Sequence, residues 1–390
     1  MQGYFRKRGS TWSFTIDIGI DPKTGKRKQK TCSGFRTKKD AQLEAAKLQQ
    51  ELSQGTFISE KDTKFKDFVK EWLREYENTV KVSTVRVREH ESGRLLSYFG
   101  GLKLKQITKK MYQDLLYDLF EKGYALNTIS GIHSTGRMIF KKAIELELIK
   151  NDPTQYAKIP RAIKTVEEIE SEKEIVKYLE KEELALFLTT AKKQGLDRDY
   201  EIFLTLAYSG VRVGELCALM WKDISFNDHT VTITKTYYNP RNIVRDYQIL
   251  PPKTRNSKRI IDLDPAVLKE LEKLKIRQSE IKMLNRNTYY DEGFVFAKTG
   301  KYLGYPEFIK TIQNRMTRLL KLSGLNYKLT PHSLRHTHTS LLAEAGVGIH
   351  EIMERLGHVE DDITKRVYLH VTKAMKTEAS KKFGELMRYL

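Results

Sequence analysis

Alternating hydrophobic and polar residues mark the first part of the chain, with the period of two that is typical of half-buried β-strands. Five apolar residues share one face of "TWSFTIDIGI": Trp12, Phe14, Ile16, Ile18 and Ile20. "GYFRKRG" before this stretch and "RKQKTCSGF" after it predict two more strands. "DPKTGK" predicts the turn that joins "TWSFTIDIGI" to "RKQKTCSGF". "TKKDAQLEAAKLQQEL" then predicts a helix with Thr37 as N-cap and Asp40 three residues on. The pattern indicates a module of three strands and one helix.

The period changes to that of a helix from Phe65 onward. Apolar residues recur at helical spacing in "FKDFVKEWLREYENTV", and "TVRVREHESGRLLSYFG", "TKKMYQDLLYDLFEKG" and "ALNTISGIHSTGRMIFKKAIELELI" continue the pattern. These segments predict a bundle of about four helices that ends near Pro153. The polar stretch from Pro160 to Tyr178, with its dense charge in "EEIESEKEIVK", is typical of a linker.

A third section begins near Leu179 and mixes helices with short strands. "KEELALFLTTAKKQG", "DYEIFLTLAYSG" and "RVGELCALMW" predict helices, whereas "HTVTITKTYY", "VRDYQILPP" and "KRIIDLD" predict strands. More helices are expected from Pro265 to the end. The predicted fold class is therefore mixed α and β with several domains. It comprises a three-stranded sheet plus helix, a helical bundle, and a mostly α domain with a small antiparallel sheet.

The charge indicates a polyanionic partner, most simply nucleic acid. The 390 residues carry a formal net charge of +20. Residues 1–50 hold twelve Lys or Arg against four Asp or Glu, and the basic side chains alternate with apolar ones along the strands. Such alternation gathers them on one face, which favours DNA contact over a merely solvated face.

Membrane and metal partners fit the composition less well. No apolar run approaches the roughly 20 residues of a spanning helix, and we expect no signal peptide. Cys32 and Cys217 lie far apart and match no CxxC spacing, so we expect buried thiols in a reducing cytosol and no zinc bound through cysteine.

"YSGVRVGELCALMW" places Arg212 at a predicted helix start, between Gly210 and Gly214. A guanidinium there opposes the helix dipole unless an anion binds. The alternative is a surface pair of Arg212 with Glu215, which stabilises little. We expect Glu215 to orient Arg212 by a hydrogen bond. A second basic residue, Lys253, follows two prolines in "PPKTRNSKRIIDL" and is predicted at a firm turn between strands, although exposed basic hairpins are common.

Three of the nine histidines fall within seven residues of "HSLRHTHTSLL". His332 and His336 have the i, i+4 spacing of a zinc helix. However, Arg335 stands between them, no acidic residue lies within the motif, and a fixed cation repels a metal dication. His332 and Arg335 share a helix face and form a donor pair suited to phosphate. We therefore predict no metal, and we assign His336 and His338 to packing or hydrogen bonding of the helix.

Downstream, Gly357 is predicted to end a helix in "IMERLGHVEDDITKRVYLHV", with His358 just beyond it and Tyr368 ten residues further on. Taken alone, Tyr368 is more typical of packing or of the surface. A phenol is a poor nucleophile at neutral pH unless cations or a base lie beside it.

The order of these motifs resembles the tyrosine recombinases, the lambda-integrase family. Successive signatures of that family are similar to "GVRVGEL", "HSLRHTHTSLL", "LGH" and "VYLHV". Each motif is weak alone, but the ordered set is specific and matches at every catalytic position: Arg212, Lys253, His332, Arg335, His358 and Tyr368. The resemblance covers the whole chain. It implies an arm-type DNA-binding domain over residues 1–60, a core-binding domain over 61–160, a linker over 161–178 and a catalytic domain over 179–390.

The chemistry of these residues suits what the resemblance implies. Two guanidiniums, those of Arg212 and Arg335, can bind the oxygens of a DNA phosphodiester, and histidines can donate hydrogen bonds or carry a proton. Lys253 can serve as general acid on the leaving 5′ oxygen. The resemblance implies that Tyr368 attacks in line and forms a 3′-phosphotyrosyl intermediate. It further implies that recombination proceeds through a Holliday junction without metal, ATP or other cofactor.

The resemblance also implies partners and a cellular setting. It implies double-stranded DNA with core and arm sites, a homotetramer on that DNA, a host DNA-bending protein and an excision directionality factor. We expect the protein in a bacterial cytoplasm, at the nucleoid when bound. We also expect it to integrate and excise a mobile element, either a phage or a conjugative transposon. A type IB topoisomerase and a non-enzymatic repressor built on a decayed recombinase are the alternatives. The resemblance leaves open the target sequence and whether His332 or His358 acts as base.

Apolar residues recur at helical spacing in the C-terminal segment "TKAMKTEASKKFGELMRYL": Met375, Ala379, Phe383, Met387 and Leu390. This stripe docks either on a neighbouring protomer or on its own domain, and the sequence does not choose between them.

Overall fold

The structure is a computed structural model that describes residues 4–20, 25–54, 62–161, 178–252, 257–357, 364–365, 368 and 387–388. Contacts within the chain divide it into two units, residues 1–169 and 170–390. The predicted linker lies outside the described residues except at its two ends, Arg161 and Tyr178. Because the linker is not described, the predicted domain boundaries stay predictions.

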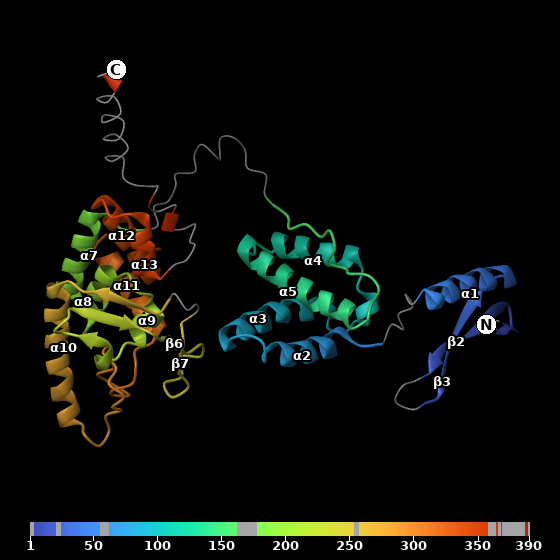
Figure 1. Ribbon diagram of the computed structural model, residues 1–390, viewed down its shortest axis with the longest axis horizontal. Helices are drawn as coiled ribbons and strands as arrows, with labels where there is room; N and C mark the ends of the chain where they lie inside the picture. The colour runs from blue at the N-terminus through green and yellow to red at the C-terminus, as the bar shows by residue number, and fades with distance from the viewer. Residues whose placement is uncertain are drawn as a thin grey trace. The chain divides into compact units, whose positions relative to one another are not determined.

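The first unit begins with a three-stranded antiparallel sheet and a helix, as the alternating pattern predicts (Figure 1). The strands pair in the order β1 (Tyr4–Arg8), β2 (Thr11–Ile20) and β3 (Arg27–Phe35), and α1 (Lys38–Ser53) follows them. The predicted capping box is present. Thr37 Oγ1 accepts a hydrogen bond from the backbone N of Asp40, and the Asp40 carboxylate accepts one from the backbone N of Thr37, both at 3.1 Å.

A small core joins this sheet to its helix. It consists of two residues of β2 and three of α1: Phe14, Ile16, Ala41, Ala45 and Leu48. The predicted apolar face of β2 does not continue to its end, because Ile20 is 68% exposed. The pairing of β2 with β3 shifts register between Asp17 and Ile20, which turns the end of the strand away from the core.

Four α-helices form the predicted bundle within residues 62–161: α2 (Phe65–Tyr76), α3 (Val82–Phe99), α4 (Lys109–Glu121) and α5 (Leu126–Glu145). Aromatic residues hold its core together. The rings of Phe65 and Phe140 stack at 5.4 Å, and Tyr112 meets Phe140 edge-on at 6.0 Å. A Cβ at Gly136 would lie 2.2 Å from the Tyr112 hydroxyl, so this glycine lets α4 approach α5 closely.

The second unit is mostly helical, as predicted. Its longer helices are α7 (Lys181–Gln194), α8 (Asp199–Ser209), α10 (Pro265–Leu284), α11 (Ile309–Leu322), α12 (Pro331–Glu344) and α13 (Ile349–Leu356). Figure 1 shows α12 and α13 at the same end of this unit. Almost every residue of α8 is buried, so α8 forms the centre against which α7, α10 and α12 pack.

Two small antiparallel sheets stand where the sequence predicted one. The first has the order β4 (Ile224–Ser225), β5 (Thr230–Ile233) and β8 (Arg259–Asp262). The second pairs β6 (Thr236–Tyr238) with β7 (Gln248–Leu250). "HTVTITKTYY" therefore holds two strands, and the break between them lies beside Lys235. Lys235 Nζ donates to the carboxylate of Asp223 at 2.7 Å.

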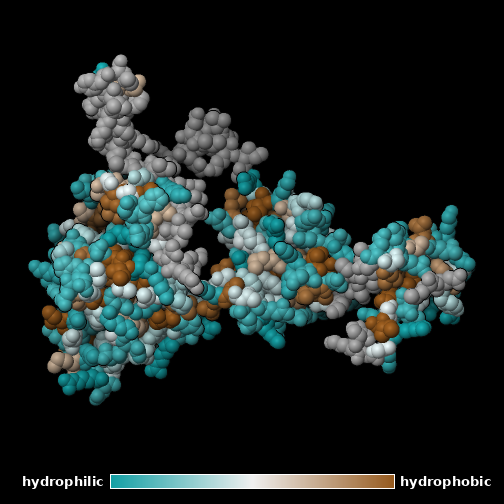
Figure 2. Space-filling view, viewed as in Figure 1, coloured by the Kyte–Doolittle hydropathy of each residue, from teal (hydrophilic) through white to brown (hydrophobic). Residues whose placement is uncertain are grey.

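The surface is dominated by hydrophilic residues on the face shown in Figure 2, where apolar residues appear only in small patches between them. Within the described ranges, no helix is long and apolar enough to cross a membrane.

Candidate active site

The turn that carries Arg212 is built on Gly210, the residue that ends α8. Gly210 has a left-handed backbone, with φ of 63°. A Cβ at Gly210 would lie 2.7 Å from His338 Cδ2 and 2.8 Å from Leu356 Cδ2. Both the backbone conformation and the space therefore require glycine here. The turn predicted from "YSGVRVGEL" is confirmed.

The helix after this turn is shorter than the sequence predicted. The pattern of "RVGELCALMW" predicted a helix through Trp221, but α9 spans only Val213–Cys217. Met220 instead forms an isolated antiparallel bridge with Phe294, and the backbone N of Met220 donates to Asp223. This tertiary pairing overrides the local helical pattern.

Arg212 is the N-cap of α9 and is held by Glu215, as predicted. The carboxylate accepts hydrogen bonds from Arg212 Nη1 at 2.8 Å and from the Arg212 backbone N at 3.0 Å. The Arg212 side chain is 36% exposed whereas that of Glu215 is 3% exposed. The pair is therefore not the solvated surface pair that was the alternative. The guanidinium is held through Nη1 by a buried carboxylate, and part of the side chain stays exposed.

A second guanidinium, that of Arg259 on β8, binds the same carboxylate. Arg259 Nη2 donates to Glu215 Oε2 at 2.8 Å, and the Arg259 side chain is 5% exposed. Burial alone would raise the pKa of the Glu215 carboxyl, but the hydrogen bond and charge of Arg259, together with Arg212, outweigh it. The pKa of Glu215 is therefore below its ordinary value, and the group is a carboxylate at neutral pH.

Arg335 on α12 joins the turn to the end of α13. Its Nη1 donates to the carbonyl of Gly210 at 2.6 Å and its Nη2 donates to the carbonyl of Leu356 at 2.5 Å. The side chain is almost fully buried, with 2% of the residue exposed. The hydrogen bond to Gly210 spans 125 positions and brings the motif of Arg335 next to the motif of Arg212.

The three histidines of α12 have different surroundings. His332 is exposed, and its ring lies edge-on to the partly buried ring of His336, with centroids 4.7 Å apart. His338 is buried and hydrogen-bonded to the carbonyl of Ala207 and to Arg355. The predicted hydrogen-bonding role of His338 is thus confirmed, and the role of His336 stays a prediction.

Tyr368 is helical and partly buried. It packs against a small apolar cluster between α12 and α13: Ala343, Ile352 and Leu356. Leu356 is also the residue whose carbonyl binds Arg335, so Tyr368 and Arg335 both contact the end of α13. We call this region, where α12 meets the end of α13, the corner. Lys253 and His358 lie outside the described residues, and their predicted roles stay predictions.

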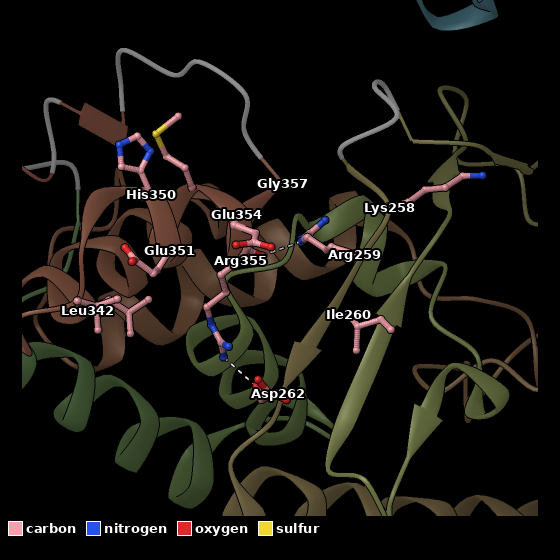
Figure 3. A pocket seen from close by; sticks show the side chains of 12 residues that line it. Lys258, Arg259, Ile260, Asp262, Leu342, His350, Glu351, Glu354, Arg355 and Gly357 are labelled. Atoms are coloured by element: carbon pink, nitrogen blue, oxygen red, sulfur yellow. Dashed lines mark hydrogen bonds between the residues drawn. The ribbon is translucent and has the colours of Figure 1, made fainter.

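A hollow of about 1060 Å³ lies beside this corner (Figure 3). Figure 3 shows Arg259 and Asp262 of β8 beside Glu354 and Arg355 of α13 along this hollow, with dashed lines for the hydrogen bonds that join the two elements. Neither Arg259 nor Arg355 was predicted from the sequence. Arg259 could have been found from the sequence, because it lies two and four residues before the buried residues Ile261 and Leu263 and so shares the inward face of the strand with them. Arg355 offers no such local signal.

The arrangement suits an anion. The guanidiniums of Arg212 and Arg259 share the buried carboxylate of Glu215, whereas those of Arg335 and Arg355 donate to backbone carbonyls and to His338. An excess of fixed, planar cations binds phosphate oxygens well. In the part of the chain that the structure describes, no three His, Cys, Asp or Glu side chains gather as a metal site would require.

Comparison with known proteins identifies the class. Residues 177–375 match the phage integrase family, residues 64–120 match the N-terminal SAM-like domain of phage integrases, and residues 4–52 match an arm DNA-binding domain. The chain belongs to the phage integrase family, the tyrosine-type site-specific recombinases that act on the DNA of mobile elements.

Individual relatives agree over nearly the full length. An integrase of Staphylococcus phage L54a is 27% identical over 362 residues, which cover 87% of this chain and 98% of that protein. The ICEBs1 integrase of Bacillus subtilis strain 168 is 25% identical over 377 residues, which cover 95% of this chain and 96% of that protein.

Two solved structures share the fold at lower identity. A Tn1549 transposon integrase in complex with a circular intermediate DNA has a TM-score of 0.63 at 22% identity, over 82% of this chain and 99% of that one. A lambda integrase tetramer bound to a Holliday junction has a TM-score of 0.57 at 18% identity, over 94% of each chain.

Proposed function

We propose that this protein cleaves and rejoins DNA at specific sites through a 3′-phosphotyrosyl intermediate, and that it integrates and excises a mobile element. The observation that carries the proposal is the hydrogen bond from Arg335 Nη1 to the Gly210 carbonyl. It joins two motifs that the reaction needs together, the turn of Arg212 and the helix of His332 and Arg335.

In the proposed reaction, Arg212 and Arg335 bind the non-bridging oxygens of the scissile phosphodiester and stabilise the charge that develops on them. The phenol oxygen of Tyr368 attacks phosphorus in line, and the bond from phosphorus to the 5′ oxygen breaks. Lys253 gives its proton to that oxygen, and His332 and His358 donate hydrogen bonds or take the phenol proton. The covalent bond conserves the phosphodiester, so rejoining needs no ATP. Glu215 and Arg259 contribute indirectly, because they fix the direction of the Arg212 guanidinium.

The protein is proposed to act as a homotetramer that holds two duplexes and passes through a Holliday junction, by analogy with the lambda integrase tetramer bound to such a junction. Residues 1–60 are proposed to bind arm sites and residues 61–160 core sites. The match of residues 4–52 to an arm DNA-binding domain supports an integrase over a type IB topoisomerase, which needs no such module. A host DNA-bending protein and an excision directionality factor are the proposed accessory partners.

The test is to trap the covalent complex. A core site is first selected from a pool of randomised duplexes by binding, and a nick is then placed beside the cleaved phosphate so that rejoining is lost. Wild-type protein should accumulate a denaturation-resistant complex with the DNA. Tyr368→Phe should form none while it binds the same duplex with unchanged affinity. A complex that persists in Tyr368→Phe shows that another residue is the nucleophile.

A second assay separates recombination from relaxation. Two labelled duplexes that each carry the site are incubated together with the protein. Exchange of labels between the duplexes is expected. Relaxation of supercoiled DNA without any exchange identifies a topoisomerase, and binding without cleavage identifies a repressor.

A further inference from the structure

His338 is locked in one tautomer by its two neighbours. Its Nδ1 lies 2.9 Å from the carbonyl oxygen of Ala207, which can only accept a hydrogen bond. Its Nε2 lies 3.1 Å from Nε of Arg355, which can only donate. The proton therefore sits on Nδ1, and Nε2 accepts from Arg355. A doubly protonated ring would set an N–H against the N–H of Arg355.

The surroundings of His338 keep it neutral. Burial is the largest cause, the charge of Arg355 is the next, and the charge of Arg335 adds to both, and together they lower the pKa of His338 to about 4. The hydrogen bond to Ala207 acts in the opposite direction but is smaller. At neutral pH His338 is thus a permanent acceptor for Arg355.

Arg355 ties three other elements to the last turn of α13. In addition to His338 on α12, its guanidinium donates from Nη2 to the carbonyl of Asp262 at 2.8 Å and to the carbonyl of Tyr208 at 3.3 Å. Figure 3 shows the side chain reaching from α13 to Asp262 at the end of β8. One side chain therefore fixes the end of α13 against α12, α8 and β8.

The last turn of α13 also binds two arginines of the site, Arg259 and Arg335. Carbonyls at a helix C-terminus lack partners within the helix. Here the carbonyl of Arg355 accepts from Arg259 Nε at 2.9 Å, and the carbonyl of Leu356 accepts from Arg335 Nη2 at 2.5 Å. Arg259 also binds Glu215, which holds Arg212. A shift of this one turn would move the supports of both Arg335 and Arg212.

We propose that His338 and Arg355 are positioning residues that set the places of the two phosphate-binding arginines through the last turn of α13. The inference rests on the proposed function, since it assumes that Arg212 and Arg335 bind the scissile phosphate. Neither residue touches the DNA in this proposal. Their contribution is to the rate of cleavage and not to the affinity for DNA.

The test compares single-turnover cleavage of the nicked duplex at saturating protein with the dissociation constant for the same duplex. His338→Phe keeps the ring volume but loses the acceptor, and Arg355→Met keeps the stem but loses every donor. Each should slow cleavage by about a hundredfold, the scale expected for a reacting group misplaced by about 1 Å. The dissociation constant should not change. His338→Gln, whose amide offers a donor nitrogen and an acceptor oxygen, should recover most of the rate.

Arg315→Met is the matched control, because it makes the same change as Arg355→Met. Arg315 is also a largely buried arginine of this unit, with a side chain 18% exposed. It donates to the carbonyl of Asp197 at 2.7 Å and to the carboxylate of Asp199 at 3.1 Å, away from the corner. Its replacement is expected to lower stability, as Arg355→Met is, yet to leave the cleavage rate unchanged.

A substrate with a methylphosphonate at the cleaved position gives a readout that general damage would not produce. One charged oxygen is replaced by a methyl group, so the arginines have less charge to stabilise and their exact placement matters less. The rate difference between wild type and Arg355→Met should shrink on this substrate. A merely structural defect would slow both substrates alike.

Three results would overturn the inference: wild-type rates in both His338→Phe and Arg355→Met, a loss of affinity that matches the loss of rate, or an equal defect on both substrates. Failure of the proposed function looks different, because wild-type protein itself would then form no covalent complex on either duplex.

Discussion

Several side chains of the candidate site are held by groups that lie far away in sequence. Glu215 is fixed by Arg259, and the Arg335 guanidinium bridges two backbone carbonyls from different elements. Buried charges of this kind need every partner, because removal of one leaves an uncompensated charge. The site therefore depends on a network of hydrogen bonds and not on the exposed residues alone.

At the scale of single residues, His338 predicts a dependence of stability on pH. Its pKa is lowered from 6.5 to about 4 in the folded protein, so the unfolded chain binds a proton more readily than the folded one. Acid then favours unfolding. The loss is absent above about pH 6.5 and amounts to about 3 kcal/mol at pH 4.

Urea unfolding of wild type and His338→Gln at several pH values between 7 and 4 measures this contribution. The free energy of unfolding should fall more steeply toward acid in wild type, because glutamine does not titrate. Other groups titrate equally in both proteins and cancel in the difference. Parallel curves would show that His338 is not the buried neutral group described above.

At the scale of elements, α8, α12 and α13 meet at Gly210, and the fit there is tight. Gly210→Ala should lower the free energy of unfolding by about 3 kcal/mol, because a left-handed backbone costs about 1–2 kcal/mol and overpacking against His338 and Leu356 adds about as much.

Gly324→Ala is the matched control. Gly324 has a similar φ of 69°, but a Cβ there would meet nothing within 4 Å. Its replacement should cost only the backbone term, about 1–2 kcal/mol. Urea unfolding of the two variants compares them directly, and equal losses would contradict close packing at Gly210.

The elements themselves follow from local pattern to different degrees. The capping box of Thr37 and the bundle helices were predicted because caps and apolar period are encoded within a few residues. The sequence did not predict that α9 is short or that there is a second small sheet. Their limits depend on the bridge from Met220 to Phe294 and on the ion pair of Lys235 with Asp223, contacts that a local pattern does not contain.

At the scale of the whole molecule, the net charge of +20 predicts steep salt dependence of DNA binding. The logarithm of the affinity should fall with the logarithm of salt concentration, with a slope of about −0.9 for each phosphate contacted. Removal of residues 1–60, which include the twelve Lys or Arg of residues 1–50, should make the slope shallower on DNA that carries an arm site. Filter binding at several salt concentrations measures both slopes. Identical slopes would mean that this module does not contact DNA.

Assembly tests the C-terminal stripe. If the residues after Thr372 dock on a neighbouring protomer, their deletion should abolish tetramers on DNA while single protomers still bind the core site. Mass measurement of the complexes distinguishes the two. Tetramers that form unchanged would show that the stripe packs on its own domain.

The sequence by itself determined the succession of modules, the positive charge and the residues of the candidate site, including Arg212, Arg335 and Tyr368. These properties are carried by local period, by composition and by the order of short motifs. Only the tertiary structure revealed the partners of Arg259 and Arg355, because these partners lie 44 and 17 positions away and no spacing within a motif specifies them. The tertiary structure also distinguished the histidines of "HSLRHTHTSLL" from one another. Burial and the carbonyl of Ala207 make His338 a neutral acceptor, whereas His332, six residues earlier on the same helix, stays exposed.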